Sequence, residues 1–274
     1  MLDTRRPFTR SDALAAGVPA SLLRGSRFRK IFRGVYVDAA VMASTRERTE
    51  AALLIFPDSA RASHTSAARI YEVPVPTIAQ EHVSVGRAEE RRHREGIVCH
   101  VSPGDSRLTR GVRVSTPEVM FVELAELLEL VDLVVVGDNL VRTGRASRES
   151  LSEAARSARG VVGRLACSAA ALIREGVDSP METRLRLLLV LAGCPEPQVN
   201  ATLRGGDGEV LRRYDLSWNT ARLIVEYDGR HHIDGSHSGS GTSTGVMRSR
   251  TTDGGSSSSR RTGSTVTRQR RSPW

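Results

Sequence analysis

The sequence of 274 residues has no apolar run near the roughly 20 residues that cross a bilayer. Its first residues, MLDTRRPFTRSD, lack the apolar segment of a secretory signal. We therefore expect a soluble, cytoplasmic protein without a membrane partner. Cysteine is scarce: Cys99, Cys167 and Cys194 are far apart and show no CxxC or Cys/His ligand spacing. This pattern indicates reduced thiols and neither a disulfide framework nor a zinc site.

Acidic residues are nearly absent from the end of the chain, and this explains most of the net charge of +9. Residues 235–274 contain seven arginines and one acid, Asp253, for a charge of +6, which leaves +3 of the +9 on residues 1–234. The body of the protein is therefore only mildly basic. A role in DNA binding has to rest on local basic clusters rather than on the overall charge.

The same end of the chain lacks hydrophobic periodicity. From Gly235 onward Ser, Gly, Thr and Arg dominate, which predicts a disordered low-complexity tail over residues 235–274. Lys30 is the only lysine, as in a GC-rich gene, and GC-rich codons read one nucleotide earlier decode from Ser238 into a charged helix, a turn and a buried strand. The tail is therefore interpreted as out of frame, with a frameshift near Asp234. A natural low-complexity tail is the alternative.

The first 40 residues predict a winged-helix unit. FTRSDALAAGV is typical of a short helix that ends at Gly17, and Pro19 opens a second helix over PASLLRGSRFRK. IFRGVYV then alternates as a strand of the wing. In such a fold the basic residues on or just after the second helix face DNA. They are Arg24, Arg27, Arg29, Lys30 and Arg33. A solvated basic face is the alternative.

The middle of the chain has mixed character. Helices are expected over residues 45–56, 63–76, 115–136, 147–158 and 161–176, and strands over 81–85 and 96–102. The helix from residue 115 begins with a cap and Pro117 and becomes too apolar to lie on a surface. Four histidines lie in this segment without a shared spacing, so none is assigned a functional role. They are His64, His82, His93 and His100.

An α+β unit is predicted to follow. SPMETRLRLLLVLAG has Ser179 as the N-cap, Pro180 in the first turn, Glu182 three residues after the cap and Gly193 just past the end, which predicts a helix. PQVNATL, VLRRYDLSW and RLIVEYDG predict three strands joined by short turns. A helix followed by antiparallel strands is typical of an α+β fold, with mixed α/β character in the middle of the chain.

Acidic residues are expected to converge at the end of this sheet. The tight turn at NTA predicts Asp215 opposite Ile224, and side-chain alternation then places Asp215, Glu226 and Asp228 on one face. Carboxylates that repel one another at close range favour a bound divalent cation. The other face is expected to line a core through Leu223, Val225 and Tyr227.

These residues carry a family resemblance. YDLSWNTARLIVEYDGRHH, preceded by METRLRLLLVLAG, resembles the endonuclease-like domain related to very-short-patch-repair nucleases, a branch of the PD-(D/E)XK superfamily. The resemblance covers Ser179 to about Asp234. It implies a hydrolase that cuts DNA with Mg²⁺ or Mn²⁺ bound by Asp215, Glu226 and Asp228.

The resemblance also implies further catalytic residues. Glu182 matches the acid on the first helix, and His231 or His232, of which we favour His232, matches the histidine after the last acid. Asp228 stands where many members have lysine, and the helix and strand that should close the fold are missing. Each residue also has an ordinary explanation: Glu182 can serve only as a cap, and Asp228 and His232 can belong to an exposed turn.

The N-terminal stretch from FTRSDALAAGV through RGVYV separately resembles the winged-helix domain of AbiEi-type antitoxins. The predicted organisation has four parts. They are a winged-helix DNA-binding domain over 1–40, a mixed middle region over 41–160, an incomplete endonuclease-like domain over 161–234 and the tail over 235–274.

Two functions compete. The first is a metal-dependent, DNA-binding endonuclease, impaired in this chain because the closing elements are missing. The second is a non-enzymatic winged-helix regulator or antitoxin of a toxin-antitoxin or phage-defence system, with DNA and a toxin or defence protein as partners. The oligomeric state is not determined by the sequence.

Overall fold

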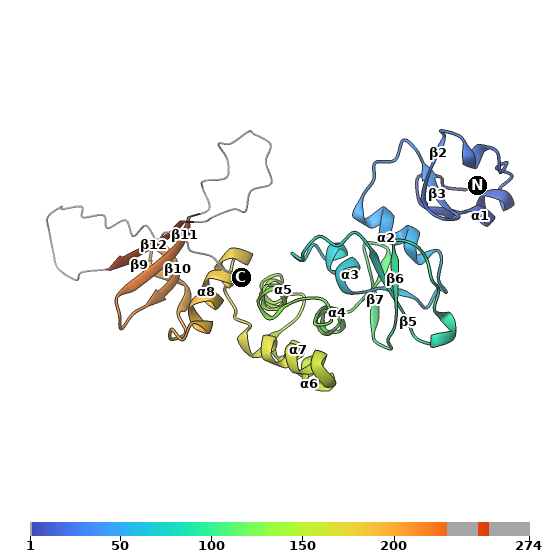
Figure 1. The fold of residues 1–274 in the computed structure, drawn as a ribbon. Coiled ribbons are helices and arrows are strands. Elements are labelled where there is room, and N and C mark those ends of the chain that lie inside the picture. Colours follow the sequence, from blue (N-terminus) through green and yellow to red (C-terminus); the bar gives the residue numbers. More distant parts are fainter. Residues whose placement is uncertain (1, 229–245, 252–274) are drawn as a thin grey trace, which may run out of the picture.

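The computed structural model describes residues 2–228 and 246–251 (Figure 1). Within these residues the fold is α+β, as predicted, and its three sheets lie one after another along the chain. A small N-terminal sheet precedes a five-stranded sheet, a group of helices and a four-stranded sheet. Each sheet is built from strands that are close in sequence, so the three sheets follow one another along the chain.

The N-terminal sheet has three antiparallel strands in the order β1-β3-β2. Its elements are β1 (Phe8–Thr9), α1 (Arg10–Ala15), the 3₁₀ turn η1 (Leu22–Arg24), β2 (Phe28–Phe32) and β3 (Val35–Asp38). Helix α1 confirms the first predicted helix, and Thr9 caps it through a capping box with Asp12. Phe8, Ala13, Leu23 and Phe28 form a small core.

The second predicted helix, over PASLLRGSRFRK, is wrong. Only Leu22–Arg24 form a 3₁₀ turn, and the chain enters strand β2 at Phe28. Phe28 and Phe32 are buried at the two ends of β2, and the pairing of this strand with β3 shifts in register between Lys30 and Phe32. The turn at Arg33 and Gly34 then splits the predicted IFRGVYV strand into the hairpin β2–β3, because Gly34 adopts a φ of 84°.

The five-stranded sheet has the order β6-β5-β4-β8-β7, with β5 parallel to β6 and β4 parallel to β8. Its segment comprises α2 (Thr45–Leu53), β4 (Arg61–Ala62), α3 (His64–Ile70), β5 (Glu81–Val85), η2 (Ala88–Glu90), β6 (Ile97–Val101), β7 (Ser106–Thr109) and β8 (Val112–Ser115). All five residues of β5 are buried. The strands predicted over 81–85 and 96–102 are confirmed.

Four helices continue the core. They are α4 (Pro117–Leu124), α5 (Leu130–Arg142), α6 (Arg148–Ser157) and α7 (Gly160–Leu172). Their buried side chains join those of α3 and β8 in one large cluster that includes Phe121, Leu133 and Ile173. The apolar run expected as one helix over 115–136 is divided at residues 125–129 into α4 and α5, so that both helices cover the same core.

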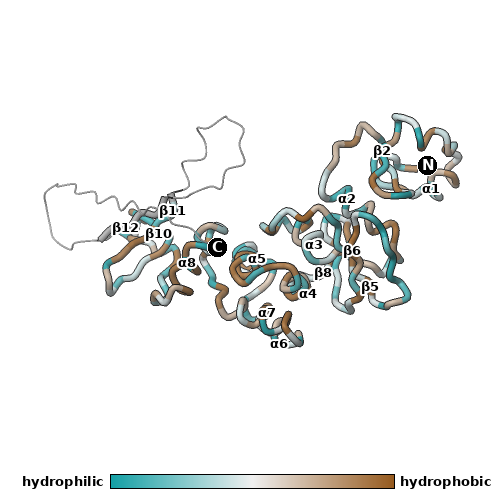
Figure 2. The backbone as a smooth tube through the Cα atoms, in the orientation of Figure 1, coloured by the Kyte–Doolittle hydropathy of each residue, from teal (hydrophilic) through white to brown (hydrophobic). Residues whose placement is uncertain are grey.

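The four-stranded sheet packs against one helix. Its elements are α8 (Pro180–Leu191), β9 (Gln198–Arg204), β10 (Val210–Trp218), β11 (Leu223–Asp228) and β12 (Val246–Thr251), with the strands in the order β12-β11-β10-β9. The predicted α8 is confirmed, because the Ser179 side chain accepts a hydrogen bond from the Glu182 main chain. The apolar part of α8 (brown in Figure 2) contributes Leu185 and Leu189 to a core with Leu216 and Val225. Leu223 and Tyr227 also contact this core, as predicted.

Helix α8 is joined to the helices before it by a buried arginine. Arg186 has no exposed surface, and its guanidinium lies 3.2 Å from the Asp138 carboxylate on α5. It also donates to the main-chain oxygen of Leu172 at the end of α7 and to Glu196. Thr183 donates to the same Asp138 carboxylate. Asp138 therefore fixes α8 to α5 and α7.

The predicted tail is described only in part. Val246–Thr251 form β12, which pairs antiparallel with the whole of β11, so these six residues are not without regular structure. Without β12, β11 would be the edge of this sheet, and an edge strand offers unpaired main-chain groups that another segment can pair with whatever its side chains are. Residues 235–245 and 252–274 lie outside the described residues, as does the predicted frameshift point at Asp234.

Candidate functional site

The predicted DNA-contacting residues do not lie on a helix. Arg24 ends the turn η1, Lys30 lies in β2 and Arg33 lies in the turn between β2 and β3; all three are exposed. Arg27 is also exposed and lies over the Phe28 ring at 5.3 Å. Arg29 differs, because its guanidinium lies 2.7 Å from the buried Glu47 carboxylate. Arg29 therefore holds β2 against α2 and is not free to contact a ligand.

The hairpin β2–β3 forms one wall of a basic groove. The other wall is the loop before β6, residues 93–96, together with Arg48 of α2. The charged residues that line the groove are Lys30, Arg33, Arg48, Arg94 and Glu95, and His93 lies beside them. Arg48 is partly neutralised because it lies 3.4 Å from Glu81. Three cations, those of Lys30, Arg33 and Arg94, thus face the groove with one acid among them.

The predicted acidic site lies on the four-stranded sheet, with a register that differs from the prediction. Ser217 pairs with Ile224, where Asp215 was expected. The loop spans residues 219–222 and Arg222 adopts a φ of 50°, so the turn has two more residues than the tight turn at NTA. A shift by an even number of residues keeps the same side chains on the same face. The expected separation of the acids from the core therefore holds.

Three of the predicted acids influence one another, and each has a partner. Burial first, and then the charges of Glu182 and Glu226, raise the pKa of Asp215 above its ordinary value. Asp215 accepts a hydrogen bond from the Tyr227 main chain at 2.8 Å, and Glu226 lies 3.3 Å from Arg212. Glu182 accepts from the Asn200 side chain at 2.9 Å. In the described part of the chain these acids belong to no group of three or more side chains with metal-ligand spacing.

Two members of the predicted site fall outside what the structure describes. His232 is outside the described residues, and Asp228 is placed only as the last residue of β11. The catalytic and metal-binding roles of Glu182, Asp215, Glu226, Asp228 and His232, and the binding of Mg²⁺ or Mn²⁺, therefore remain predictions.

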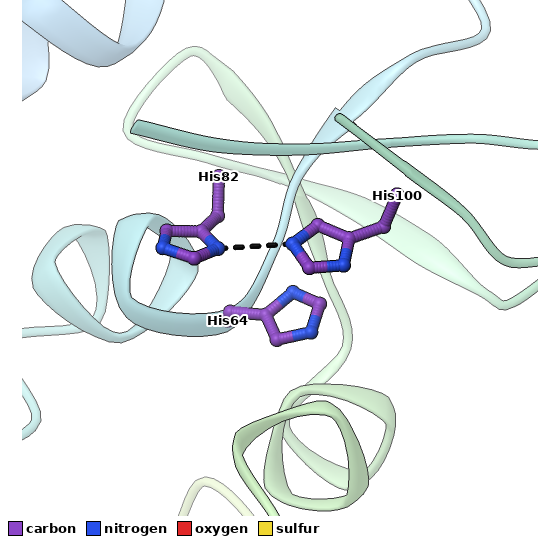
Figure 3. Close-up of side chains that lie close together, drawn as sticks. All are labelled: His64, His82 and His100. Carbon is purple, nitrogen blue, oxygen red and sulfur yellow. Dashed lines mark hydrogen bonds between the residues drawn. The ribbon is translucent and has the colours of Figure 1, made fainter. Parts of the chain in front are cut away.

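A cluster of three histidines lies in the five-stranded sheet (Figure 3). His64 is the first residue of α3, directly after β4, while His82 and His100 lie on β5 and β6. Because β5 and β6 are parallel and pair Ser84 with His100, side-chain alternation puts His82 and His100 on the same face. No sequence signal identified this cluster. Its successive members are 18 positions apart, and the folding of the sheet brings them together.

The rings of the cluster are in direct contact. Nδ1 of His82 and Nε2 of His100 are 2.9 Å apart, joined by the dashed line in Figure 3. The His64 ring stacks on that of His100 with centroids 3.8 Å apart. One possible ligand atom from each histidine lies within 4.8 Å of the others, and no other group of this kind occurs in the described part of the chain. These residues could hold a metal ion.

Charged side chains surround the cluster. The main chain of His64 donates to the Glu123 carboxylate, which lies 3.0 Å from the guanidinium of Arg61. The Glu126 carboxylate lies 3.3 Å from Nε2 of His64 and 3.7 Å from Nδ1 of His100. Burial raises the pKa of Glu123, although Arg61 opposes this effect.

Burial keeps the imidazoles neutral. Burial, and then the neighbouring His100 and His82, lower the pKa of His64 to about 2. Burial, and then His100 and Arg69, lower the pKa of His82 to about 4, and burial also lowers the pKa of His100. The rings therefore carry free lone pairs at neutral pH, which is the state in which imidazole binds metals.

Comparison with known proteins gives a class for the middle of the chain. Residues 55–173 match the AbiEi antitoxin C-terminal domain. We call these residues the antitoxin-like region. The antitoxin resemblance was expected in the N-terminal 40 residues, whereas the match lies in the segment to which no family was assigned. The three histidines and Glu126 all lie within the antitoxin-like region.

Curated relatives add no function. Two uncharacterized proteins of Mycobacterium tuberculosis, MT2308 and Rv2248, are each 29% identical over 136 residues. The matched part is 48% of this chain and 49% of each relative, so the chain spans about half the length of the curated relatives it matches. A crystal structure of the RV2827C protein from Mycobacterium tuberculosis aligns with 74% of this chain and 85% of its own, at 15% identity and a TM-score of 0.42.

The helices of this protein are short and carry polar side chains. None of those in the described part of the chain has both the length and the apolar character needed to cross a bilayer. This result agrees with the absence of long apolar runs from the sequence.

Proposed function

We propose that this protein is a non-enzymatic DNA-binding regulator of the antitoxin type. The match of residues 55–173 to an antitoxin domain supports the class. The observation that carries DNA binding is the basic groove between the β2–β3 hairpin and the loop before β6. Lys30, Arg33 and Arg94 line this groove and have no carboxylate partner among the described ion pairs. Such cations bind phosphates and release counterions.

The proposal corrects the set of DNA-contacting residues. Arg29 is assigned to the fold because it pairs with Glu47, and Arg94 is added because it faces the groove from the opposite wall. Arg24 and Arg27 remain exposed neighbours on the N-terminal unit. The contact is made by a hairpin and a loop in place of a reading helix, so we expect most contacts to be with the DNA backbone.

Fluorescence anisotropy of the full chain with labelled duplex DNA tests this proposal. Replacing Lys30, Arg33 and Arg94 together by Ala should weaken binding and flatten the plot of log affinity against log salt by about 0.9 for each lost phosphate contact. The matched control replaces three exposed arginines of the helical region, Arg142, Arg156 and Arg164. The arginine-rich tail is present in both variants, so its contribution cancels.

If the control variant loses as much affinity as the groove variant, the binding reflects total charge and the groove is ordinary surface. If neither variant changes affinity or salt slope, the regulator proposal loses its DNA-binding component. Loss confined to the groove variant supports it.

The antitoxin class also implies a protein partner. We propose that the antitoxin-like region takes part in binding a toxin or defence protein, since this region carries the family match. Co-expression with a candidate toxin tests this: the chain should relieve the growth arrest that the toxin causes. The groove variant should relieve arrest equally well if neutralisation and DNA binding use different surfaces.

A metal-dependent endonuclease is the second candidate. The mutual influence of Asp215, Glu182 and Glu226 favours it, because such acids converge in nuclease sites. Their engagement by Tyr227, Arg212 and Asn200 weakens it. Cleavage of plasmid DNA with Mg²⁺ or Mn²⁺, abolished by chelator and by Asp215→Asn, would establish it. Binding without cleavage under the same conditions leaves the regulator.

A further inference from the structure

The histidine cluster has the composition of a transition-metal site. We propose that His64, His82 and His100 bind one divalent zinc ion, with the Glu126 carboxylate completing the coordination. Three imidazoles and one carboxylate form a nitrogen-rich set that suits zinc, whereas Mg²⁺ and Ca²⁺ prefer oxygen ligands. The site is separate from the basic groove and from the acids on the four-stranded sheet, and it does not depend on either proposed function.

The distances fit one ion. In a tetrahedral site with Zn–N bonds of about 2.0–2.1 Å, ligand nitrogens lie roughly 3.3 Å apart. Nδ1 of His82 and Nε2 of His100 are 2.9 Å apart, and one ring nitrogen of each histidine lies within 4.8 Å of those of the other two. These separations are on the scale of one coordination shell, and ligation requires the His64 ring to turn out of its stack on His100.

The backbone holds the three ligands in place. His82 and His100 lie on paired parallel strands, so their separation is set by main-chain hydrogen bonds. His64 has a φ of 48°, a left-handed conformation that is unfavourable for a residue with a side chain. Its main-chain N–H is held by the Glu123 carboxylate. Strained residues of this kind concentrate at binding sites, because the surrounding structure maintains the strain.

The local charge favours a cation. The charge of buried Arg61 acts on His64, and it is matched by Glu123 at 3.0 Å. Arg69, which faces His82, is paired with Glu81 at 2.8 Å. Glu126 approaches only the histidines, at 3.3 Å and 3.7 Å. The charge of Arg91 also acts on His100, and Glu126 is the carboxylate that would offset it and approach a metal ion.

The cluster as it stands leaves one polar atom unsatisfied. Nε2 of His82 is buried and has no hydrogen-bond partner among the described residues. In the pair of His82 and His100, one ring has to donate a proton and the other has to accept it. A metal bound by Nδ1 of His82 and Nε2 of His100 would replace this ring–ring hydrogen bond with two metal–nitrogen bonds, whereas Nε2 of His82, on the other side of its ring, is not a ligand atom of the site. Glu126 is 47% exposed, so an ion can reach the site from solvent along its side chain.

Metal binding by the full chain tests the proposal, and the protein should carry no histidine tag. After treatment with chelator and addition of Zn²⁺, we expect one zinc per chain by plasma mass spectrometry. X-ray absorption should report nitrogen ligands at about 2.0–2.1 Å. Zinc at 100 times its dissociation constant should raise the unfolding temperature by about 5–10 °C, and an equal concentration of Mg²⁺ should not.

Three single variants separate ligation from folding. His100→Gln removes a ligand and should weaken zinc binding about 100-fold or more, while Glu126→Gln should weaken it about 10- to 100-fold. His93→Gln is the matched control, because His93 is exposed and lies outside the cluster. Glu126 is half-exposed, so its variant reports on binding even if His100→Gln fails to fold.

A chain that takes up no zinc under these conditions would overturn the proposal and make the cluster a packed stack of neutral rings. Equal zinc loss in His93→Gln and Glu126→Gln would also overturn it, since binding would then be unrelated to the cluster. Stoichiometric zinc that is lost in His100→Gln and weakened in Glu126→Gln, but kept in His93→Gln, establishes the site.

Discussion

The five-stranded and four-stranded sheets both collect ionisable side chains, but they bury them to very different degrees. At the five-stranded sheet Arg61 of β4 and Glu123 of α4 are 4% and 5% exposed, and the three histidines lie beside them. On the four-stranded sheet Arg212 and Glu226 are 44% and 27% exposed. The first sheet shares its core with helices α3 to α8, whereas the buried core of the second consists of Leu185, Leu216 and Val225.

This difference shows what burial does for a candidate site. A polar side chain that is packed on all sides has few alternative positions, and its pKa is shifted because its charged form is desolvated. A side chain on a thin sheet keeps solvent as an alternative partner. Burial therefore restricts the positions of the three histidines and favours their neutral form. On the four-stranded sheet, Asp215 accepts a hydrogen bond and Glu226 forms an ion pair with a neighbour.

The largest expected effect is the loss of a buried ion pair. Arg61→Ala should lower the free energy of unfolding by about 3–5 kcal/mol at pH 7, because Glu123 is left as a buried charge without a partner. Arg212→Ala, its counterpart on the four-stranded sheet, should cost less than about 1 kcal/mol. Urea denaturation followed by circular dichroism measures both. If both variants lost the same free energy of unfolding, burial would not make the ion pair of the five-stranded sheet more important for stability than that of the four-stranded sheet.

A change of pH should produce the next largest effect, in metal-free protein. His64 and His82 have pKa values near 2 and 4 when folded and about 6.5 when unfolded, so the unfolded chain binds more protons below pH 6.5. Stability should therefore be full above pH 7 and fall as the pH drops below 6.5, by up to about 1.4 kcal/mol per pH unit for each histidine. Arg61, Arg69 and Arg91 face the rings and reinforce this direction, and Glu126 opposes it.

Unfolding curves at pH 7.5, 6.5 and 5.5 in the presence of chelator check this prediction. His82→Gln should reduce the pH dependence, because it removes one group that titrates only in the unfolded chain. A wild-type protein that gains stability between pH 7.5 and 5.5 would contradict the neutral state of the cluster.

The smallest expected effect concerns the acids. Asp215→Asn keeps an oxygen that can accept from the Tyr227 main chain and removes the repulsion from Glu182 and Glu226, so stability at pH 7 should rise by less than about 1 kcal/mol. Thermal unfolding with and without Mg²⁺ measures it. If Mg²⁺ stabilises the wild type but not Asp215→Asn, the four-stranded sheet binds the ion after all, and the contrast between the sheets weakens.

Much of the local structure follows from sequence signals. The cap at Ser179 with Pro180 and Glu182 predicts α8, and the alternation in VLRRYDLSW predicts β10. Strand β5 is predicted at its observed bounds. These signals work because they act between residues that are close in the chain, where capping and alternation are decided.

The parts that were missed depend on contacts between distant residues. The segment after Pro19 has helical signals, but burying Phe28 and Phe32 on the N-terminal sheet draws it into β2. Strands β4 and β8 are too short to stand out, since they gain their stability from pairing across about 50 residues of chain. The histidine cluster depends on these pairings, so its members look like unrelated histidines until the sheet is formed.

The ion pair between Arg186 and Asp138 crosses the end of the antitoxin-like region, so the matched region and the packed unit have different boundaries. The antitoxin-like region ends at residue 173, yet Asp138 within it finds its counter-charge on α8, beyond that boundary. A chain cut after Ile173 would leave Asp138 without its cation and would expose the side of α5 that α8 covers. Recombination or engineering that moves this region into another protein must therefore carry α8 with it, or replace Asp138 by an apolar residue.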